Sequence, residues 1–271
     1  MSRLAAAIAF AACALSSLPA AAQLVFAVTE GVTYQATPKE IREKFEPLAD
    51  AIGKALRREV RIVLVPAYDD ARAGLARQEF DIAFVHPAHV SLAEVKTGRY
   101  RTLAWTAGFT DYTVSLLTRP DAPLKSLEDI RGRMLVTPDP DSITAVMVRA
   151  MLREQKLGAN DLKVRTTRYQ DAVPFYLDNH FAQVGATASR GVVKSWTDKG
   201  GKVGVQSRPV PIKQFIASTR LSGDDADRVR DVLLNLAHND LGKKALAASG
   251  YRAFVAPNAE VEATTIVWLG L

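Results

Sequence analysis

Short apolar runs alternate with amphipathic stretches along most of this chain. These runs predict a buried strand at residues 24–28 and further strands at residues 60–65, 81–85, 134–136, 164–166 and 181–186. The other stretches carry apolar residues at helical spacing and predict helices, which fall at residues 38–56, 69–77, up to 95, 142–156, 169–177, 191–199, 224–237 and 241–248. Strand and helix in alternation predict parallel sheets with helices on both faces.

The alternation occurs in two series, which predicts two similar α/β lobes. Residues 114–117 and 215–217 are apolar segments between the two series, and we expect them to cross from one lobe to the other. We assign residues 23–110 and 214–271 to the first lobe and residues 111–213 to the second. Open α/β sheets bind ligands beyond the carboxyl ends of their strands, so we expect a ligand cleft between two hinged lobes.

The first 22 residues have the composition of a cleavable export signal. Arg3 precedes an apolar run at residues 4–15, and the small residues 20–22 form a cleavage site before Gln23. The run is too short for a transmembrane helix. This predicts export to the periplasm. Cys13 is the sole cysteine, and we do not expect it to carry lipid, since the residues after it stay apolar. The chain after cleavage then has no thiol for a disulfide, metal site or nucleophile.

The net charge is mildly positive. It is +6 for the whole sequence and +5 without the signal, which contains one Arg and no acid. The basic residues are dispersed and are not interleaved with aromatic residues, so we expect no nucleic-acid binding. We expect a monomer whose surface is suited to solubility or to gentle steering of anions.

Polar residues follow several strands and point to an anion site. Ser142 and Thr144 lie at the predicted start of a helix, where unpaired N–H groups and the helix dipole favour negative charge. Capping of the helix by Asp141 or Ser142 is the structural alternative for this segment. The expected ligand shell comprises Thr33, Tyr34, His86, Ser142, Ile143, Thr144, Tyr169, Thr187 and Ser189.

Four motifs occur in an order that resembles one family. They are Phe-Glu-Pro-Leu-Ala at 45–49, Asp-Ile-Ala-Phe-Val-His-Pro at 81–87, Leu-Glu-Asp-Ile-Arg-Gly at 127–132 and Asp-Ser-x-Thr at 141–144. Together with the export signal they resemble the phosphate/phosphite/phosphonate periplasmic substrate-binding proteins of ABC transporters. The resemblance implies a type II periplasmic-binding fold that closes on a small anionic solute. It also implies delivery to an inner-membrane permease with a separate ATPase, and no cofactor.

The chain departs from that family's pattern at several positions of the implied site. His86 replaces a glycine, Val90 a tyrosine, Ile143 a hydroxyl residue, Tyr169 a histidine, and Gln183 and Ala188 replace acids. The lost acids are partners for a ligand amine or a protonated phosphonate oxygen. The solute therefore stays open between phosphate, phosphite, a phosphonate and another small acid.

The alternative functions are an enzyme, a metal-solute receptor and a periplasmic sensor module. An enzyme is not expected, because there is no Gly-x-Ser-x-Gly elbow and no nucleotide-binding Gly-x-x-x-x-Gly-Lys loop. A metal-solute receptor would use His86 and His89, but no third ligand follows at diagnostic spacing. A periplasmic sensor module for another small organic acid would share the same fold.

Overall fold

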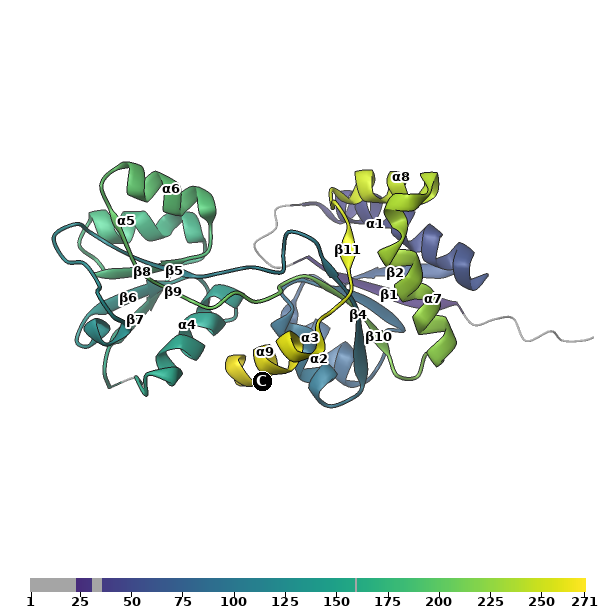
Figure 1. The fold of residues 1–271 in the computed structure, drawn as a ribbon, viewed down its shortest axis with the longest axis horizontal. Coiled ribbons are helices and arrows are strands. Elements are labelled where there is room, and N and C mark those ends of the chain that lie inside the picture. The colour runs from purple at the N-terminus through teal and green to yellow at the C-terminus, as the bar shows by residue number, and fades with distance from the viewer. Residues whose placement is uncertain (1–22, 31–35, 159) are drawn as a thin grey trace, which may run out of the picture.

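The computed structural model describes residues 23–30, 36–158 and 160–271. In this part of the chain the strands form two sheets, one of six strands and one of five (Figure 1). The expected export signal and the predicted ligand residues Thr33 and Tyr34 lie outside the described residues.

The six-stranded sheet has the order β11-β4-β10-β3-β1-β2. Its strands are β1 (Leu24–Thr29), β2 (Val60–Leu64), β3 (Ile82–Val85), β4 (Tyr100–Thr106), β10 (Gln214–Ser218) and β11 (Phe254–Val255). The helices that accompany it are α1 (Pro38–Leu56), α2 (Tyr68–Ala76), α3 (His89–Lys96), α7 (Gly223–Leu234), the short η3 (Leu236–His238), α8 (Asp240–Ser249) and α9 (Ala259–Leu269).

The five-stranded sheet has the order β7-β6-β8-β5-β9. Its strands are β5 (Ser115–Thr118), β6 (Met134–Thr137), β7 (Lys163–Thr166), β8 (Val184–Thr187) and β9 (Lys202–Gln206). The helices around it are the short η1 (Leu127–Ile130), α4 (Ile143–Glu154), the short η2 (Gln170–Ala172), α5 (Val173–Asp178) and α6 (Arg190–Asp198).

Both sheets are mixed: the strands of the predicted strand–helix alternation are parallel, and the crossing segments, whose direction was not predicted, are antiparallel. The strands β1, β2 and β3 run parallel, as do β6, β7 and β8, but β10 is antiparallel to β3, and β5 is antiparallel to β8. The register gives the reason. Gln214, the first residue of β10, pairs with Val85 at the end of β3, and Ser115 at the start of β5 pairs with Thr187 at the end of β8. Each crossing strand enters its sheet at the edge where the parallel strands end, and it therefore runs backward.

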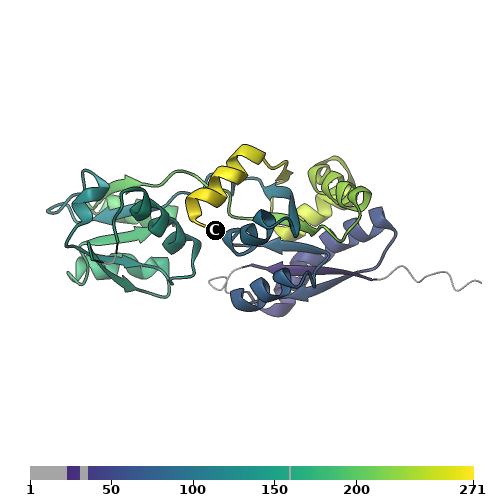
Figure 2. The same ribbon diagram turned by 90° about the horizontal axis from the view of Figure 1, so that it is seen from below.

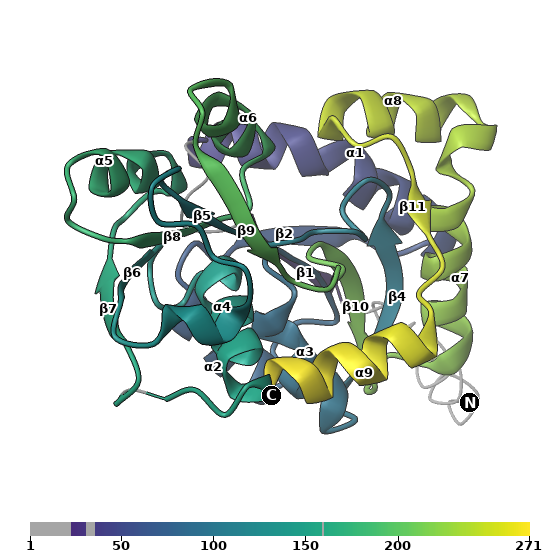
Figure 3. The same cartoon turned by 60° about the vertical axis from the view of Figure 1, so that its left-hand side comes forward.

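Two connecting segments, residues 107–114 and 207–213, join the sheets. They run side by side, because Tyr112 and Val210 form an antiparallel bridge and Phe109 accepts a hydrogen bond from the Ile212 N–H (3.0 Å). Figure 3 shows β9 and β5 leading into these segments beside α4. The carboxyl ends of the parallel strands of both sheets thus face the junction between the lobes.

Helix α9 forms a further link between the lobes. Figure 2 shows it lying across the junction between the two halves of the molecule. Its residues Ile266, Trp268 and Leu269 share one buried cluster with Leu92 of α3 and Met147 of α4. The apolar residues of this C-terminal segment are thus packed as part of a helix that the apolar pattern did not predict. Neither β4, β9 nor β11 was predicted.

Candidate functional site

The start of α4 has a local structure that its sequence dictates. Strand β6 ends at Thr137, two prolines break the extended run, and the Ser142 hydroxyl then accepts a hydrogen bond from the Ala145 N–H at 3.2 Å. Ser142 is therefore the helix cap. Helix geometry gives the N–H groups of the first turn, including those of Ile143 and Thr144, no partner within the helix. The Ile143 side chain itself is buried in the core of the second lobe.

Thr144 and Thr187 are brought together through two residues that the sequence patterns did not single out. The Tyr112 hydroxyl lies 3.1 Å from the Thr144 hydroxyl, and the Gln170 amide nitrogen donates to Tyr112 at 3.4 Å. The Gln170 carbonyl oxygen accepts from the Thr187 hydroxyl (3.0 Å). It also accepts the N–H groups of Ala188 (2.5 Å) and Ser189 (3.1 Å). Four segments far apart in sequence therefore converge on one hydroxyl and amide network.

Ser189 also caps a helix. Its hydroxyl accepts from the Val192 N–H at 3.3 Å at the start of α6. A second helix N-terminus thus lies directly after the loop that the Gln170 amide organises. Two helix starts and their unpaired N–H groups favour negative charge at this edge of the second sheet.

Tyr169 lines a cavity of ≈ 340 Å³ between the lobes. The first lobe contributes Ala67, Tyr68 and Asp69, and the second contributes Asp139, Asp141, Arg168 and Tyr169. The Arg168 guanidinium lies 5.3 Å from the centre of the Tyr169 ring, and the ring is 38% exposed. Tyr169 is therefore on the rim of the cleft, apart from the Tyr112–Gln170 network.

His86 directly follows β3 in the first lobe. Its Nδ1 lies 3.2 Å from the Ile212 carbonyl oxygen, which can only accept, so Nδ1 carries the proton. Burial, with a further contribution from the charge of Lys213, lowers the pKa of His86 to about 4. The ring is therefore neutral near pH 7, and its Nε2 is a hydrogen-bond acceptor.

Glu30, Lys44 and Lys213 form a buried charge cluster close enough to His86 for Lys213 and Glu30 to act on its pKa. The Glu30 carboxylate is 4% exposed and accepts from Lys44 (2.8 Å) and from the Tyr251 hydroxyl (2.6 Å). Lys213 Nζ lies 3.5 Å from Glu30 and 4.5 Å from the centre of the Phe109 ring. Burial alone would raise the pKa of Glu30, but Lys213, Lys44 and Tyr251 together lower it. Two lysines against one carboxylate give this side of the junction a positive potential.

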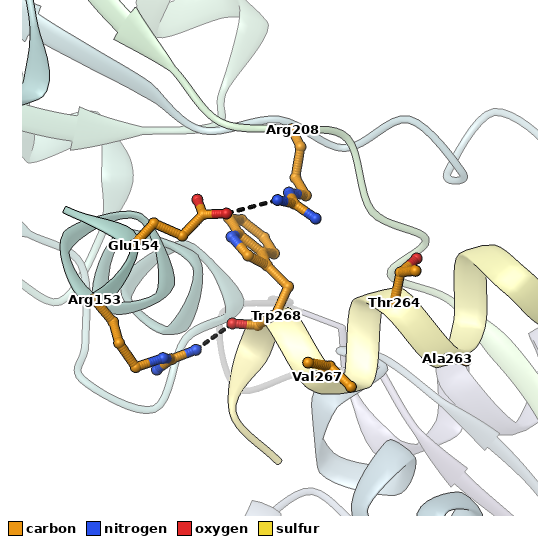
Figure 4. A pocket seen from close by; sticks show the side chains of 7 residues that line it. All are labelled: Arg153, Glu154, Arg208, Ala263, Thr264, Val267 and Trp268. Atoms are coloured by element: carbon orange, nitrogen blue, oxygen red, sulfur yellow. Dashed lines mark hydrogen bonds and ion pairs between the residues drawn. The ribbon is translucent and has the colours of Figure 1, made fainter. Parts of the chain in front are cut away.

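A second cavity, of ≈ 480 Å³, lies at the end of α4 and is lined mainly by α9 (Figure 4). Its lining residues are Arg153, Glu154, Arg208, Ala263, Thr264, Val267 and Trp268. Arg208 pairs with Glu154 at 2.6 Å and lies over the Trp268 ring. None of the predicted ligand residues lines it, so it is not the site where their loops converge.

Within the described ranges, no group of three or more His, Cys, Asp or Glu side chains is placed to hold a metal ion. No helix in the same part of the chain has the length and apolar character needed to cross a membrane.

Residues 31–261 match the family described as the phosphonate periplasmic substrate-binding protein of ABC transporters. The chain belongs to this family. The family consists of transport proteins and not of enzymes, so the chain is a periplasmic solute-binding component of an ABC importer. A comparison of the sequence with curated proteins finds no match.

Solved structures share the fold at low sequence identity. XAC2383 from Xanthomonas citri bound to ATP has a TM-score of 0.74 at 17% identity, covering 91% of this chain and 96% of that one. PhnD1 from Prochlorococcus marinus in complex with methylphosphonate has a TM-score of 0.64 at 12% identity, covering 91% and 96%. A binding protein component of an ABC phosphonate transporter from Pseudomonas aeruginosa has a TM-score of 0.57 at 16% identity, covering 91% and 94%. The chain therefore has the type II periplasmic-binding fold.

Proposed function

We propose that the chain captures a small tetrahedral oxyanion (phosphate, phosphite or a small phosphonate) at the first turn of α4 and delivers it to an inner-membrane permease. One observation carries this proposal. The Tyr112 hydroxyl lies between the Thr144 hydroxyl and the Gln170 amide, directly beside a helix N-terminus. Hydroxyl, amide and backbone donors that converge at a helix start suit an anion whose oxygens accept several hydrogen bonds.

The first lobe supports the same ligand class. Lys44 and Lys213 exceed the charge of Glu30, and their buried setting makes the positive potential stronger than it would be in water. His86 Nε2 adds an acceptor, which suits a ligand oxygen that carries a proton. A protonated oxygen is available on phosphate and phosphonate monoanions but not on sulfate at neutral pH.

The ligand shell that we propose unites residues from both lobes. It comprises Thr33, Tyr34 and His86 from the first lobe, and Ser142, Ile143, Thr144, Tyr169, Thr187 and Ser189 from the second, with Tyr112 and Gln170 added. Ile143 would contribute its N–H group, since its side chain is buried. PhnD1, which shares the fold, is complexed with methylphosphonate, and this supports the ligand class.

We further propose that residues 23–110 with 214–271 and residues 111–213 move as two bodies about the connecting segments. In this proposal residues 1–22 are removed as a signal peptide, and the remaining chain works as a monomer that binds no nucleic acid.

A ligand screen tests the proposal. Protein beginning at Gln23 would be heated with phosphate, phosphite, methylphosphonate, sulfate, ethanesulfonate and small carboxylates, because a ligand that binds only the folded state raises the melting temperature. We expect a phosphorus oxyanion to give the largest rise, with one site per chain by calorimetry. If only a carboxylate or a sulfonate raised the melting temperature, the ligand class would be that compound's and not a phosphorus oxyanion. No response to any phosphorus oxyanion would overturn it.

A further inference from the structure

One ion pair crosses the cleft between the lobes. Arg72 lies on α2 of the first lobe, and Asp141 directly precedes the cap of α4 in the second. The Arg72 guanidinium donates to both carboxylate oxygens of Asp141, at 2.9 Å from Nη1 and 2.5 Å from Nη2. This bidentate geometry is the strongest that an arginine and a carboxylate can adopt, and it fixes their orientation as well as their distance.

A second side chain of the first lobe faces the same carboxylate. His89, at the start of α3, is 5% exposed, and its Nε2 lies 3.8 Å from Asp141 Oδ1. In the part of the chain that the structure describes, neither ring nitrogen of His89 has a hydrogen-bond partner. His89 and Arg72 together hold the pKa of Asp141 well below its usual range. Asp69 also contacts Arg72, at 3.1 Å, and so lies at the edge of the same group.

The position of Asp141 bears on ligand binding. Its carboxylate is one residue from Ser142, at the helix start where we place the anion. An unneutralised carboxylate there would repel the ligand, and Arg72 both neutralises it and ties it to the first lobe. The arginine can do this only when the lobes are close together.

We propose that Arg72 and Asp141 are positioning residues whose ion pair holds the two lobes closed over the anion site. This inference rests on the proposed function for its effect on binding, but not for its effect on lobe closure. Separating the lobes removes Asp141 from Arg72 and from the buried His89 together. The ion pair therefore stabilises the closed arrangement of the lobes even when no ligand is bound.

The test measures the distance between the lobes directly. The sole cysteine, Cys13, lies in the segment we expect to be removed, so Asp50→Cys on α1 and Ser195→Cys on α6 can carry spin labels at two exposed positions. Pulsed electron resonance without added ligand should give a longer and broader distance distribution in Arg72→Ala and Asp141→Ala than in the parent. Glu94→Ala is the matched control, because it breaks the Arg99–Glu94 pair (2.6 Å) within the first lobe.

A double-variant cycle and a binding measurement complete the test. Arg72→Ala with Asp141→Ala should open the lobes no further than Asp141→Ala alone, because that single change already removes the contact with Arg72. Each variant should weaken the binding of inorganic phosphate about three- to tenfold, mainly through faster dissociation. Unchanged distances in both single variants, or additive opening in the double variant, would overturn the inference. Failure of the parent to bind any oxyanion would instead overturn the proposed function. The distance measurement would still decide whether the Arg72–Asp141 pair holds the lobes closed.

Discussion

The Tyr112 hydroxyl lies 3.1 Å from the Thr144 hydroxyl and joins a connecting segment to the first turn of α4. Tyr112 also forms the bridge with Val210 in the other connecting segment. The residue that completes the candidate anion site is therefore part of the junction about which the lobes would move. In the proposed site a ligand at Thr144 would contact this junction directly, which would link occupancy of the site to the angle between the lobes.

Replacing Tyr112 by phenylalanine should weaken binding and leave the fold intact. The ring stays, and only the hydroxyl shared by Thr144 and Gln170 is removed. A hydrogen bond to a charged group contributes about 1.5–3 kcal/mol, so affinity for the oxyanion found in the screen should fall roughly 10- to 100-fold. Isothermal calorimetry measures this, with Tyr176→Phe in α5 as the control. Equal affinities of Tyr112→Phe and the parent would exclude Tyr112 from the site.

Ser142→Ala combined with Thr144→Ala should abolish most binding. Ser142 also caps α4, so some stability is lost as well, typically about 1 kcal/mol for a cap. Ser222→Ala separates the two effects, because the Ser222 hydroxyl caps α7 in the same way, accepting from the Asp225 N–H at 3.1 Å. We expect the control to lose similar stability in urea unfolding and to keep full affinity. Similar affinity losses in both proteins would mean that Ser142 acts only on stability.

Gln170→Glu should reduce affinity more than stability. A glutamate keeps the acceptor for Thr187, Ala188 and Ser189, but it loses the donor to Tyr112 and places a negative charge beside the anion. Gln183→Glu makes the same chemical change at the opposite end of β8, where the side chain accepts from the Met134 N–H. Titration of both variants should show weaker binding only for Gln170→Glu. An unchanged affinity would place the ligand elsewhere in the cleft.

His86 makes the fold sensitive to acid. Its pKa is about 4 in the folded protein, against 6.5 for an unperturbed histidine, because burial disfavours the charged ring. The unfolded chain therefore takes up a proton between these values that the folded chain does not. The free energy of unfolding therefore has its full value above about pH 6.5. It decreases as the pH falls to 4, by roughly 3 kcal/mol at most. Urea unfolding across this range should show a shallower pH dependence for His86→Gln than for the parent or for His238→Gln, which alters an exposed histidine. Identical slopes would count against a His86 ring that stays neutral in the folded protein.

Glu30→Ala should destabilise the first lobe strongly. Lys44 and Lys213 would lose their common carboxylate in a buried setting, and breaking a buried ion pair from one side costs about 3–5 kcal/mol. Glu43→Ala is the control, since its pairing with Lys39 is exposed and contributes little. Urea unfolding of the two variants measures the difference. A loss below about 1 kcal/mol for Glu30→Ala would show that the cluster is solvated or rearranged.

Features that depend on neighbours in sequence could be predicted from the sequence. The strand, turn and cap at Ser142 are local, as is the cap at Ser189, and both hydroxyls lie at helix starts as expected. The crossing segments were placed within a residue of β5 and β10, because apolar runs of that length fit buried strands. Their direction could not be read from the pattern, since a run of apolar residues is the same in a parallel and an antiparallel strand.

The contacts that complete the candidate site are long-range, and no local sequence pattern indicates them. Tyr112 lies in a loop 32 residues before Thr144, and nothing near it in sequence distinguishes it from a surface tyrosine. Arg72 on α2 reads as an ordinary exposed helix residue, although it meets Asp141 across the cleft. Helix α9 was missed because Thr264, Thr265, Ile266 and Val267 are β-branched and favour strands. It forms nevertheless, with Asn258 as its cap and Gly270 in the left-handed conformation after its end.

Helix α9 completes an interior that both lobes share. Trp268 belongs to the apolar cluster that α3 and α4 share, its carbonyl oxygen accepts a hydrogen bond from Arg153, and the Leu271 carbonyl accepts one from Lys96. The apolar interior shared by the two lobes is therefore complete only when the residues from 259 onward are in place. A chain that stopped before residue 259 would leave α3 and α4 without the helix that covers both, and Arg153 and Lys96 without these two carbonyl partners.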